Sequence, residues 1–450
     1  MRIGRIKFNT PKITSSRKSR NSKSKTSGTG VLSAKARKAR NADTQNRKTG
    51  GAKNQKTRGT KNPKLSFWGV SARVVMIVFA SLLVLSCASV FFNPAKLWLM
   101  NLLGLLFLPL FLINIVLFCW AARKRSWSSV IPLVAIIPSC FFFTRYVQPF
   151  HKTVDESVSD YVSADAPTSK SADAGQSSVA HDRIYDAAHP QNQIRILSYN
   201  VGRFALSSAF KNVRECSDSL FMYLSQTDSD IICLQEYYGL DSKDLERYVR
   251  RYLPGYAVNS YMFSMRRGCF GNVTLSRLPV VDKGKVLFPE SRNLAIYTEY
   301  VSDGDRFRVY NCHLESYAVS LANIWKILKG DKQVFMETGQ RMRRSILRRP
   351  QQVDNVLSSI ESCHLKSFVC GDFNDSPISN TYYRVSHGRE DSFVKAGHGF
   401  GASFGPFWPF IRIDYIFSPD EYTPVSHYTP KVKYSDHYPV ISDIRLGGSI

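Results

Sequence analysis

The pattern of hydrophobic and polar positions divides the chain into four stretches. Residues 1–69 contain few large apolar side chains, and residues 70–145 are dominated by three long apolar blocks. Residues 146–193 are rich in Ser, Ala and Asp, and residues 194–450 alternate short apolar runs with polar ones. The pattern predicts a disordered tail, a membrane region, a flexible linker and a single globular domain, in that order.

The three apolar blocks predict about three transmembrane helices, at 74–92, 97–122 and 127–143. A helix needs about 20 mostly apolar residues to cross a bilayer. The blocks lack a polar face, which argues against a buried helix hairpin of a soluble domain. The third block is short and carries Pro132 and Pro138, so a re-entrant segment is the alternative.

Charge is concentrated in the tail and suggests an orientation. Residues 1–64 contain 20 Lys and Arg against one acid, Asp43, and therefore supply +19 of the formal net charge of +26. Basic segments next to membrane helices stay in the cytoplasm, so we place the tail and residues 123–125 (Arg-Lys-Arg) there. Three spans then put residues 146–450 outside the cytoplasm, and a re-entrant third block would reverse this.

Residues 194–450 alternate strand-like and helix-like segments, as an α/β domain does. Helical spacing of apolar residues predicts helices at 213–226 and 351–363. Apolar runs predict strands at 194–201, 230–236, 256–263, 271–276, 294–301, 306–315, 367–374, 412–417 and 435–446.

Several of the predicted strands stop at a polar side chain that can bind a metal or move a proton. These residues are Asn200, Glu236, His313, Asp372, Asn374, Asp414, Asp436 and His437. Each has an ordinary alternative: VCGDFNDSP (369–377) also reads as a turn, and His313 as a buried core histidine. Because the ends of strands are common places for sites in layered folds, their recurrence predicts one shared site.

The order of six short motifs resembles the endonuclease/exonuclease/phosphatase superfamily, the DNase I-like group. The motifs are LSYNV, LQE, NCHLE, GDFND, RIDYI and SDHYPV, and the resemblance covers 194–447. It implies an α/β fold, specifically a four-layer α/β/β/α sandwich. It also implies Mg²⁺, with Mn²⁺ as the alternative, and hydrolysis of a phosphoester by in-line attack of water. The tail, spans and linker resemble those of membrane-anchored bacterial members.

The resemblance also implies roles for individual residues. The metal ligands would be Asn200, Glu236 and Asp436, the catalytic residues His313, Asp372, Asn374, Asp414 and His437, and the substrate-binding arginine Arg277. Asp372 would orient or deprotonate the attacking water, and Asp414 would fix the tautomer of His437. The two histidines would contact the scissile phosphate from either side.

The substrate is less constrained by the sequence. A basic insertion, with eight Lys or Arg and two acids between Lys326 and Arg349, suits nucleic acid or an anionic membrane, or is a solvated helix. Nucleic acid ranks slightly ahead of phospholipid, with a small phosphoester as a further alternative. DNA-repair members of the superfamily typically have a second Asn or Asp two residues after the Asn of the first motif, and this chain has Gly202 there. This departure argues against an abasic-site repair enzyme. A non-catalytic membrane scaffold with a nucleic-acid- or lipid-binding tail is the alternative of a different class. No C-x-x-C pair, P-loop or G-x-S-x-G motif occurs.

Overall fold

The computed structural model describes residues 67–149, 192–202, 212–240, 243–266, 268–289, 291–302 and 304–447. The predicted tail at 1–69 lies outside these residues except for 67–69, which begin the first helix. Most of the predicted linker at 146–193 also lies outside them.

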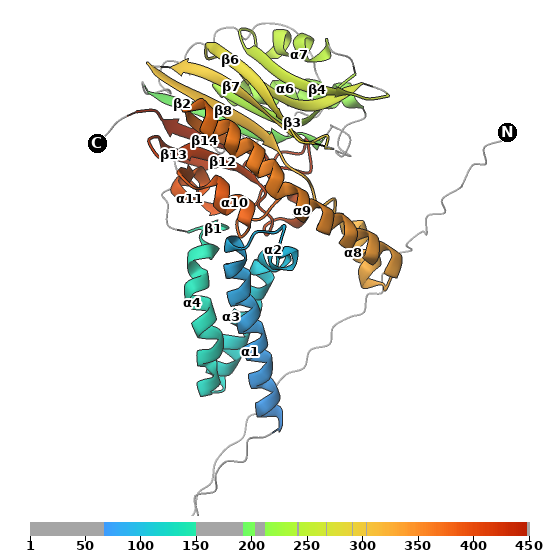
Figure 1. The fold of residues 1–450 in the computed structure, drawn as a ribbon, viewed down its shortest axis with the longest axis vertical. Coiled ribbons are helices and arrows are strands. Elements are labelled where there is room, and N and C mark those ends of the chain that lie inside the picture. The colour runs from blue at the N-terminus through green and yellow to red at the C-terminus, as the bar shows by residue number, and fades with distance from the viewer. Residues whose placement is uncertain are drawn as a thin grey trace, which may run out of the picture. The chain divides into compact units, whose positions relative to one another are not determined.

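The globular part is built on two six-stranded mixed sheets (Figure 1). One sheet has the order β13-β14-β2-β3-β5-β4 and the other β10-β12-β9-β8-β7-β6. The first comprises β2 (Gln193–Asn200), β3 (Ile231–Gly239), β4 (Ala257–Ser264), β5 (Cys269–Ser276), β13 (Thr423–Tyr428) and β14 (Val440–Arg445). The second comprises β6 (Val280–Leu287), β7 (Leu294–Ser302), β8 (Asp305–His313), β9 (Lys366–Asp372), β10 (Arg389–Asp391) and β12 (Asp414–Pro419).

Helices cover the outer faces of both sheets. The first sheet is covered by α6 (Val213–Gln226) and α7 (Asp244–Tyr252), and the second by α9 (Lys332–Cys363) and α10 (Asn380–Val385). A third apolar cluster, which includes Ile196, Cys233 and Phe368, fills the space between the sheets. The predicted α/β sandwich is confirmed. Shorter elements are α8 (Leu321–Leu328), α11 (Ser392–Ala396), η4 (Gly405–Phe407), β1 (Val147–Gln148) and β11 (Gly399–Phe400).

Local sequence explains the best-predicted helix. Asn212 caps α6 by accepting a hydrogen bond from the backbone N–H of Glu215 at 3.0 Å. Cys216, Leu220 and Leu224 then recur at helical spacing and are buried against the first sheet. The observed bounds are those predicted, 213–226.

The apolar blocks form helices that differ from three straight spans. They are α1 (Phe67–Ala88), α2 (Trp98–Leu105), α3 (Phe107–Arg123) and α4 (Val130–Phe143), with short 3₁₀ turns η1 (Ser89–Phe91) and η2 (Trp127–Ser129). The second block is not one helix, because α2 and α3 meet at a bend of 58°. Among the described residues, one helix, Val70–Phe91, is long and apolar enough to cross a membrane by itself, or two if the bent pair counts as one span.

The helix bundle packs directly on the globular domain. Ile378, six residues after Asp372, is buried in one cluster with Leu83, Phe107 and Phe111 of the bundle. The first residues of the predicted linker are not a flexible stalk, because Val147–Gln148 pairs with Gly399–Phe400 as a two-stranded sheet. The bundle therefore touches the loop that follows Asp372.

Candidate active site

Asp372 ends β9 at a place where the backbone requires glycine. Gly371 has a φ of 133°, and a Cβ there would lie 1.9 Å from the carbonyl oxygen of Cys312 in the neighbouring strand β8. Only glycine tolerates both conditions. The close pairing of β8 and β9 sets His313 directly opposite Asp372 in the register.

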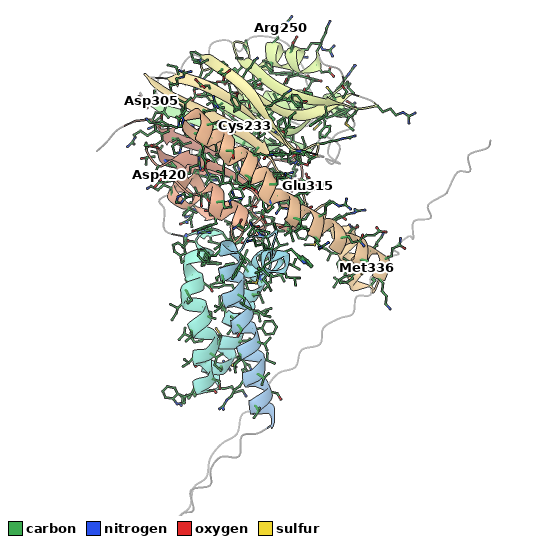
Figure 2. All side chains as sticks on the ribbon, in the orientation of Figure 1. Cys233, Arg250, Asp305, Glu315, Met336 and Asp420 are labelled. Carbon is green, nitrogen blue, oxygen red and sulfur yellow. The ribbon has the colours of Figure 1, made fainter. Side chains whose placement is uncertain are left out.

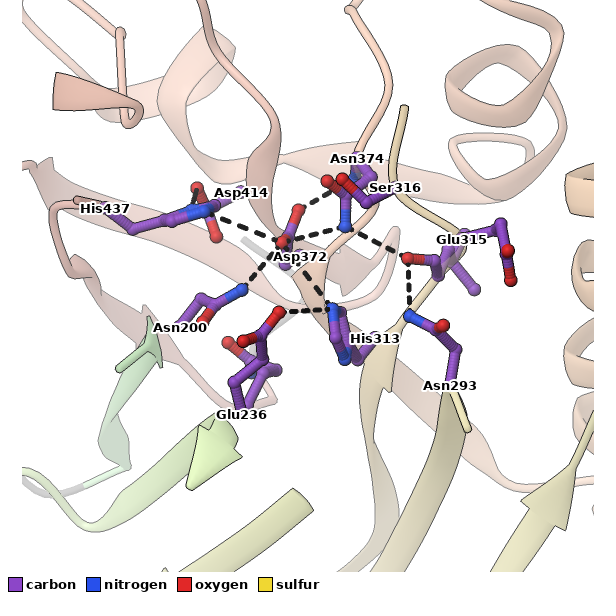
Figure 3. A network of polar contacts seen from close by, with 12 residues as sticks. Asn200, Glu236, Asn293, His313, Glu315, Ser316, Asp372, Asn374, Asp414 and His437 are labelled. Atoms are coloured by element: carbon purple, nitrogen blue, oxygen red, sulfur yellow. Dashed lines mark hydrogen bonds and ion pairs between the residues drawn. The ribbon is translucent and has the colours of Figure 1, made fainter. Parts of the chain in front are cut away.

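The Asp372 carboxylate is 1% exposed and is held by amide groups on two sides (Figure 3). Its Oδ2 accepts hydrogen bonds from Asn200 Nδ2 at 2.8 Å and from Asn374 Nδ2 at 2.9 Å. Its Oδ1 accepts one from the backbone N–H of Asn374 at 2.8 Å. These bonds fix the orientation of the carboxylate.

Two histidines flank Asp372. His313 Nε2 lies 4.0 Å and His437 Nε2 lies 3.9 Å from Asp372 Oδ2. Glu236 Oε1 is 3.5 Å from His313 Nε2, and Asp414 Oδ2 is 2.9 Å from His437 Nδ1. The structure thus brings together residues from β2, β3, β8, β9, β12 and the segment before β14.

Glu236 reaches this cluster through an irregularity in β3. Leu234 pairs with Val273 and Tyr237 with Gly271, so two residues of β3 face the single residue Asn272 of β5. At this bulge Glu236 has a φ of 53°, which is uncommon for a residue other than glycine. Bulges re-aim side chains next to sites, and here the carboxylate points toward His313 (Figure 3).

The charges of the cluster are strongly coupled. Burial and the nearby carboxylate of Asp414 raise the pKa of Asp372 to about 7, against the opposing effect of His437. Burial by itself would lower the pKa of His437, but the carboxylates of Asp414 and Asp372 outweigh it and raise the pKa to about 10. The raised pKa favours the protonated form of His437, whose Nδ1–H donates to Asp414.

Two predicted site residues have contacts that differ from those described above. Asp436 directly precedes His437 and contributes to raising its pKa, while its Oδ1 accepts a hydrogen bond from Ser435 at 3.3 Å. Arg277 is not brought to the cluster, and its predicted role in substrate binding stays a prediction. Arg277 directly follows β5, and Ser276 at the end of β5 pairs with Ile231 at the start of β3. Ile231 lies roughly 16 Å along β3 from Glu236. Arg277 bonds Asp228 at 2.5 Å and Asp230 at 2.7 Å instead.

Sequence reasoning missed a buried group beside the cluster. Asp375, 2% exposed, forms an ion pair with Arg349 at 2.7 Å and accepts a hydrogen bond from Tyr317 at 2.8 Å. Tyr317 also accepts one from Asn101 of α2 at 2.9 Å. The sequence signal for this group was the second Asp of the GDFND motif. The residues bonded to it, directly or through Tyr317, lie in distant parts of the chain, and the sequence alone does not connect them.

Comparison with known protein families identifies the globular domain. The model of the endonuclease/exonuclease/phosphatase family matches residues 197–437. The chain belongs to this family. Its members are generally hydrolases of phosphoester bonds and typically use a divalent metal. The matched range contains every predicted site residue, and a second model, a domain of unknown function (DUF8431), matches residues 70–146. No curated protein matches the chain.

Several solved structures resemble the family domain. An endonuclease/exonuclease/phosphatase from Beutenbergia cavernae DSM 12333 is 18% identical over 57% of this chain and 72% of its own, with a TM-score of 0.44. One from Bacteroides vulgatus is 17% identical over 57% and 100%, with a TM-score of 0.44. D. rerio TDP2, complexed with a single-strand DNA product, is 16% identical over 57% and 100%, with a TM-score of 0.42.

Proposed function

We propose that this protein is a membrane-anchored, metal-dependent phosphoesterase that hydrolyses phosphodiester bonds by attack of water. The observation that carries the proposal is the buried carboxylate of Asp372, fixed by two amides and flanked by His313 and His437. Such a set can activate water on one side of a phosphate and neutralise charge on the other. It also argues against the non-catalytic scaffold, which needs no such arrangement.

The side chains suit a hard divalent cation such as Mg²⁺, with Mn²⁺ as the alternative. Carboxylate and amide oxygens are its preferred ligands. The ligand atoms of Asp372, Asp414 and His437 lie within 4.8 Å of one another. In the structure Asp414 Oδ2 is bonded to His437 Nδ1, and Asp372 Oδ2 accepts from two amides. We therefore assign the cation to Glu236, with Asn200 and Asp436. When bound, the cation polarises the phosphoryl oxygens and balances developing negative charge.

The remaining residues accept the proton of the attacking water or contact the phosphate. Asp372, with a pKa of about 7, accepts a proton from the attacking water, and Asn374 holds that water or a phosphate oxygen. Asp414 Oδ2 accepts a hydrogen bond from Nδ1–H of His437, which leaves Nε2–H on the side of Asp372 and available to the phosphate. His313 contacts the phosphate from the Glu236 side.

The packing of the helix bundle supports membrane anchoring. Its interior holds polar residues that donate hydrogen bonds within the bundle: Asn114 Nδ2 donates to Phe79 O at 3.0 Å, and Ser139 Oγ to Ala135 O at 2.7 Å. Large apolar side chains face outward, including Val116 (66% exposed) of α3 and Phe141 (67% exposed) of α4. This arrangement suits a lipid surround, because intramembrane polar groups face the bundle interior.

We propose that α1, α3 and α4 each traverse the membrane, with α2 at the domain-side surface. The end of the bundle remote from the domain carries Arg73, which donates to Ser128 at 3.0 Å, and the basic run 123–125. The other end contacts the domain, where Arg145 donates to Pro377 O at 2.9 Å. The positive-inside rule then leaves the basic end in the cytoplasm and the family domain outside.

The proposal is tested with the full-length protein in detergent and a panel of DNA, RNA, phospholipid and simple phosphodiesters. We expect hydrolysis with Mg²⁺ or Mn²⁺ that a chelator abolishes. Glu236→Gln should raise the Mg²⁺ concentration for half-maximal rate, whereas Asp443→Asn, a carboxylate paired with Arg195 at 2.6 Å, should not. Turnover that persists in chelator would refute the metal-dependent mechanism.

A further inference from the structure

The insertion between His313 and β9 forms a helical hairpin with an uncovered apolar face. We call residues 321–336, which comprise α8 and the start of α9, the hairpin tip. Within the described chain no residue of α8 is buried, although Leu321, Trp325 and Leu328 recur at helical spacing. Trp325 is 64% and Leu328 71% exposed, and Phe335 of α9 is 59% exposed. Figure 2 shows Met336, also exposed, at the hairpin tip.

Positive charge predominates beside this apolar face, where Asp331 is the one exposed acid among residues 321–336. Lys326, Lys329 and Lys332 are exposed at the tip, and Arg343 and Arg344 are exposed further along α9. An exposed helix with aromatic and aliphatic residues on one face and lysines beside them is typical of segments that lie in a membrane interface. The lysines add attraction to anionic headgroups. A phosphate backbone would use the cations but leave the apolar side chains in water.

The hairpin adjoins the part of the bundle that we place at the membrane surface. Its Arg349 donates to Tyr317 at 3.0 Å, and Tyr317 accepts from Asn101 of α2 at 2.9 Å. Figure 1 shows α8 on the side of the sheets where α2 lies, and α9 packs on α2. Leu97 and Leu99, beside and within α2, are also exposed. Exposed apolar side chains therefore occur both at the hairpin tip and at α2.

We propose that the hairpin tip docks onto the bilayer that the bundle crosses, with its apolar face among the lipids and its lysines at the headgroup phosphates. The proposal rests on the membrane anchoring proposed above. Leu321 of the hairpin tip follows His313 by only eight residues. Ile378, which is buried in the bundle cluster, follows Asp372 by six. Short segments therefore connect both His313 and Asp372 to the side of the domain that we place at the membrane. The substrate class that fits this placement is a phosphodiester carried by a membrane lipid.

Fluorescence quenching tests the docking without any catalytic readout. Full-length wild type, Trp325→Phe and Trp120→Phe are reconstituted into nanodiscs of anionic and zwitterionic lipid, with or without brominated acyl chains. Subtracting the fluorescence of each variant from that of wild type gives the emission of the one tryptophan that was replaced. We expect bromine to quench both indoles and acrylamide to reach Trp325 poorly. A quenched Trp120 with an unquenched Trp325 would overturn the docking alone, and an unquenched Trp120 would overturn the membrane anchor as well.

Hydrolysis by matched variants tests the substrate class. Leu328→Glu places a charge on the docking face, and Val281→Glu places one at an exposed position of β6. We expect Leu328→Glu to reduce hydrolysis of phospholipid vesicles about tenfold or more while sparing a water-soluble phosphodiester, and Val281→Glu to change neither. Equal rates of vesicle hydrolysis by both variants would overturn the proposal. DNA cleavage that needs Lys326 and Lys329 but not Leu328 would assign the tip to nucleic acid instead.

Discussion

Asn101 of α2 donates a hydrogen bond to the phenolic oxygen of Tyr317 at 2.9 Å, and Tyr317 in turn donates to Asp375 at 2.8 Å. This chain of bonds joins the apolar region of the protein to the loop that carries Asp372 and Asn374. The same loop is backed by Ile378, whose carbonyl lies against α2 and η1. The geometry of the active site therefore depends on the bundle.

A methyl group at Gly104 should disturb this contact. A Cβ there would lie 2.2 Å from Ile378 O and 2.4 Å from Ser89 Oγ, so Gly104→Ala must move α2 or the loop. Small misplacements of catalytic groups cost up to about 100-fold in rate, and we expect kcat to fall about 10-fold or more. Gly339→Ala is the matched control, because nothing lies within 4 Å of its Cβ position. Equal kcat values for the two variants would show that the bundle does not position the loop.

The pH dependence of hydrolysis should report the pairing of His437 with Asp414. The pKa of His437 is raised to about 10, so its protonated form persists at neutral pH and is lost only as the pH rises toward that value. Asp414→Asn removes the bonded carboxylate, which lowers the pKa of His437 and moves the basic limb of the kcat profile to lower pH. Asp443→Asn should leave the profile in place. A basic limb that is identical in Asp414→Asn and wild type would exclude His437 as the titrating group.

Arg277 should act on stability and not on substrate. Its side chain is 29% exposed and pairs with Asp228 and Asp230. Loss of this half-buried network in Arg277→Gln should cost about 1–2 kcal/mol of unfolding free energy, measured by denaturant titration. KM should match that of wild type. A large rise in KM at unchanged stability would restore the original prediction of a substrate-binding arginine.

His427 should make the domain sensitive to acid. Burial and the nearby Arg412 lower its pKa from 6.5 to about 3, while its Nδ1 lies 2.8 Å from Ser392 Oγ. As the pH falls from 6.5 toward 3, the unfolded chain binds this proton before the folded one does. The unfolding free energy should therefore fall by up to about 1.4 kcal/mol per pH unit from this group.

Denaturant titrations between pH 7 and 4 measure this slope. His427→Gln should flatten it, and His387→Gln, at an exposed position, should leave it unchanged. Parallel slopes for all three proteins would mean that the pKa of His427 is the same in the folded and the unfolded chain, which would contradict the lowered pKa.

The family domain was largely predictable because its local signals agree with its tertiary structure. The apolar spacing of 213–226 and the cap at Asn212 define α6 regardless of what packs on it. The clustering of most predicted site residues was predictable because polar side chains at strand ends are visible in sequence. The side chain of Glu236 is directed into the site by a bulge at which Glu236 has a positive φ. This bulge depends on the pairing of β3 with β5, and no local sequence pattern marks it.

The errors arose where long-range pairing decides the outcome. The motif around Arg277 predicts substrate binding, and antiparallel pairing of β5 with β3 sets this residue at the far end of β3 from Glu236, a separation that the sequence does not show. The block 97–122 was taken as one helix, although the chain bends at Leu106 so that α2 can pack beside the domain. The predicted helix 351–363 is only the end of α9, since basic residues and Pro350 obscure the apolar spacing before it.

The most direct test of the account is single-turnover hydrolysis of a phosphodiester by wild type and Asp372→Asn in saturating Mg²⁺. Asn keeps the volume of the side chain but cannot accept the proton of the attacking water. We expect the rate of the chemical step to fall about 10²- to 10⁴-fold, while the circular dichroism spectrum and the unfolding midpoint of Asp372→Asn stay those of a folded protein. A folded Asp372→Asn variant that hydrolyses the substrate as fast as wild type would contradict it.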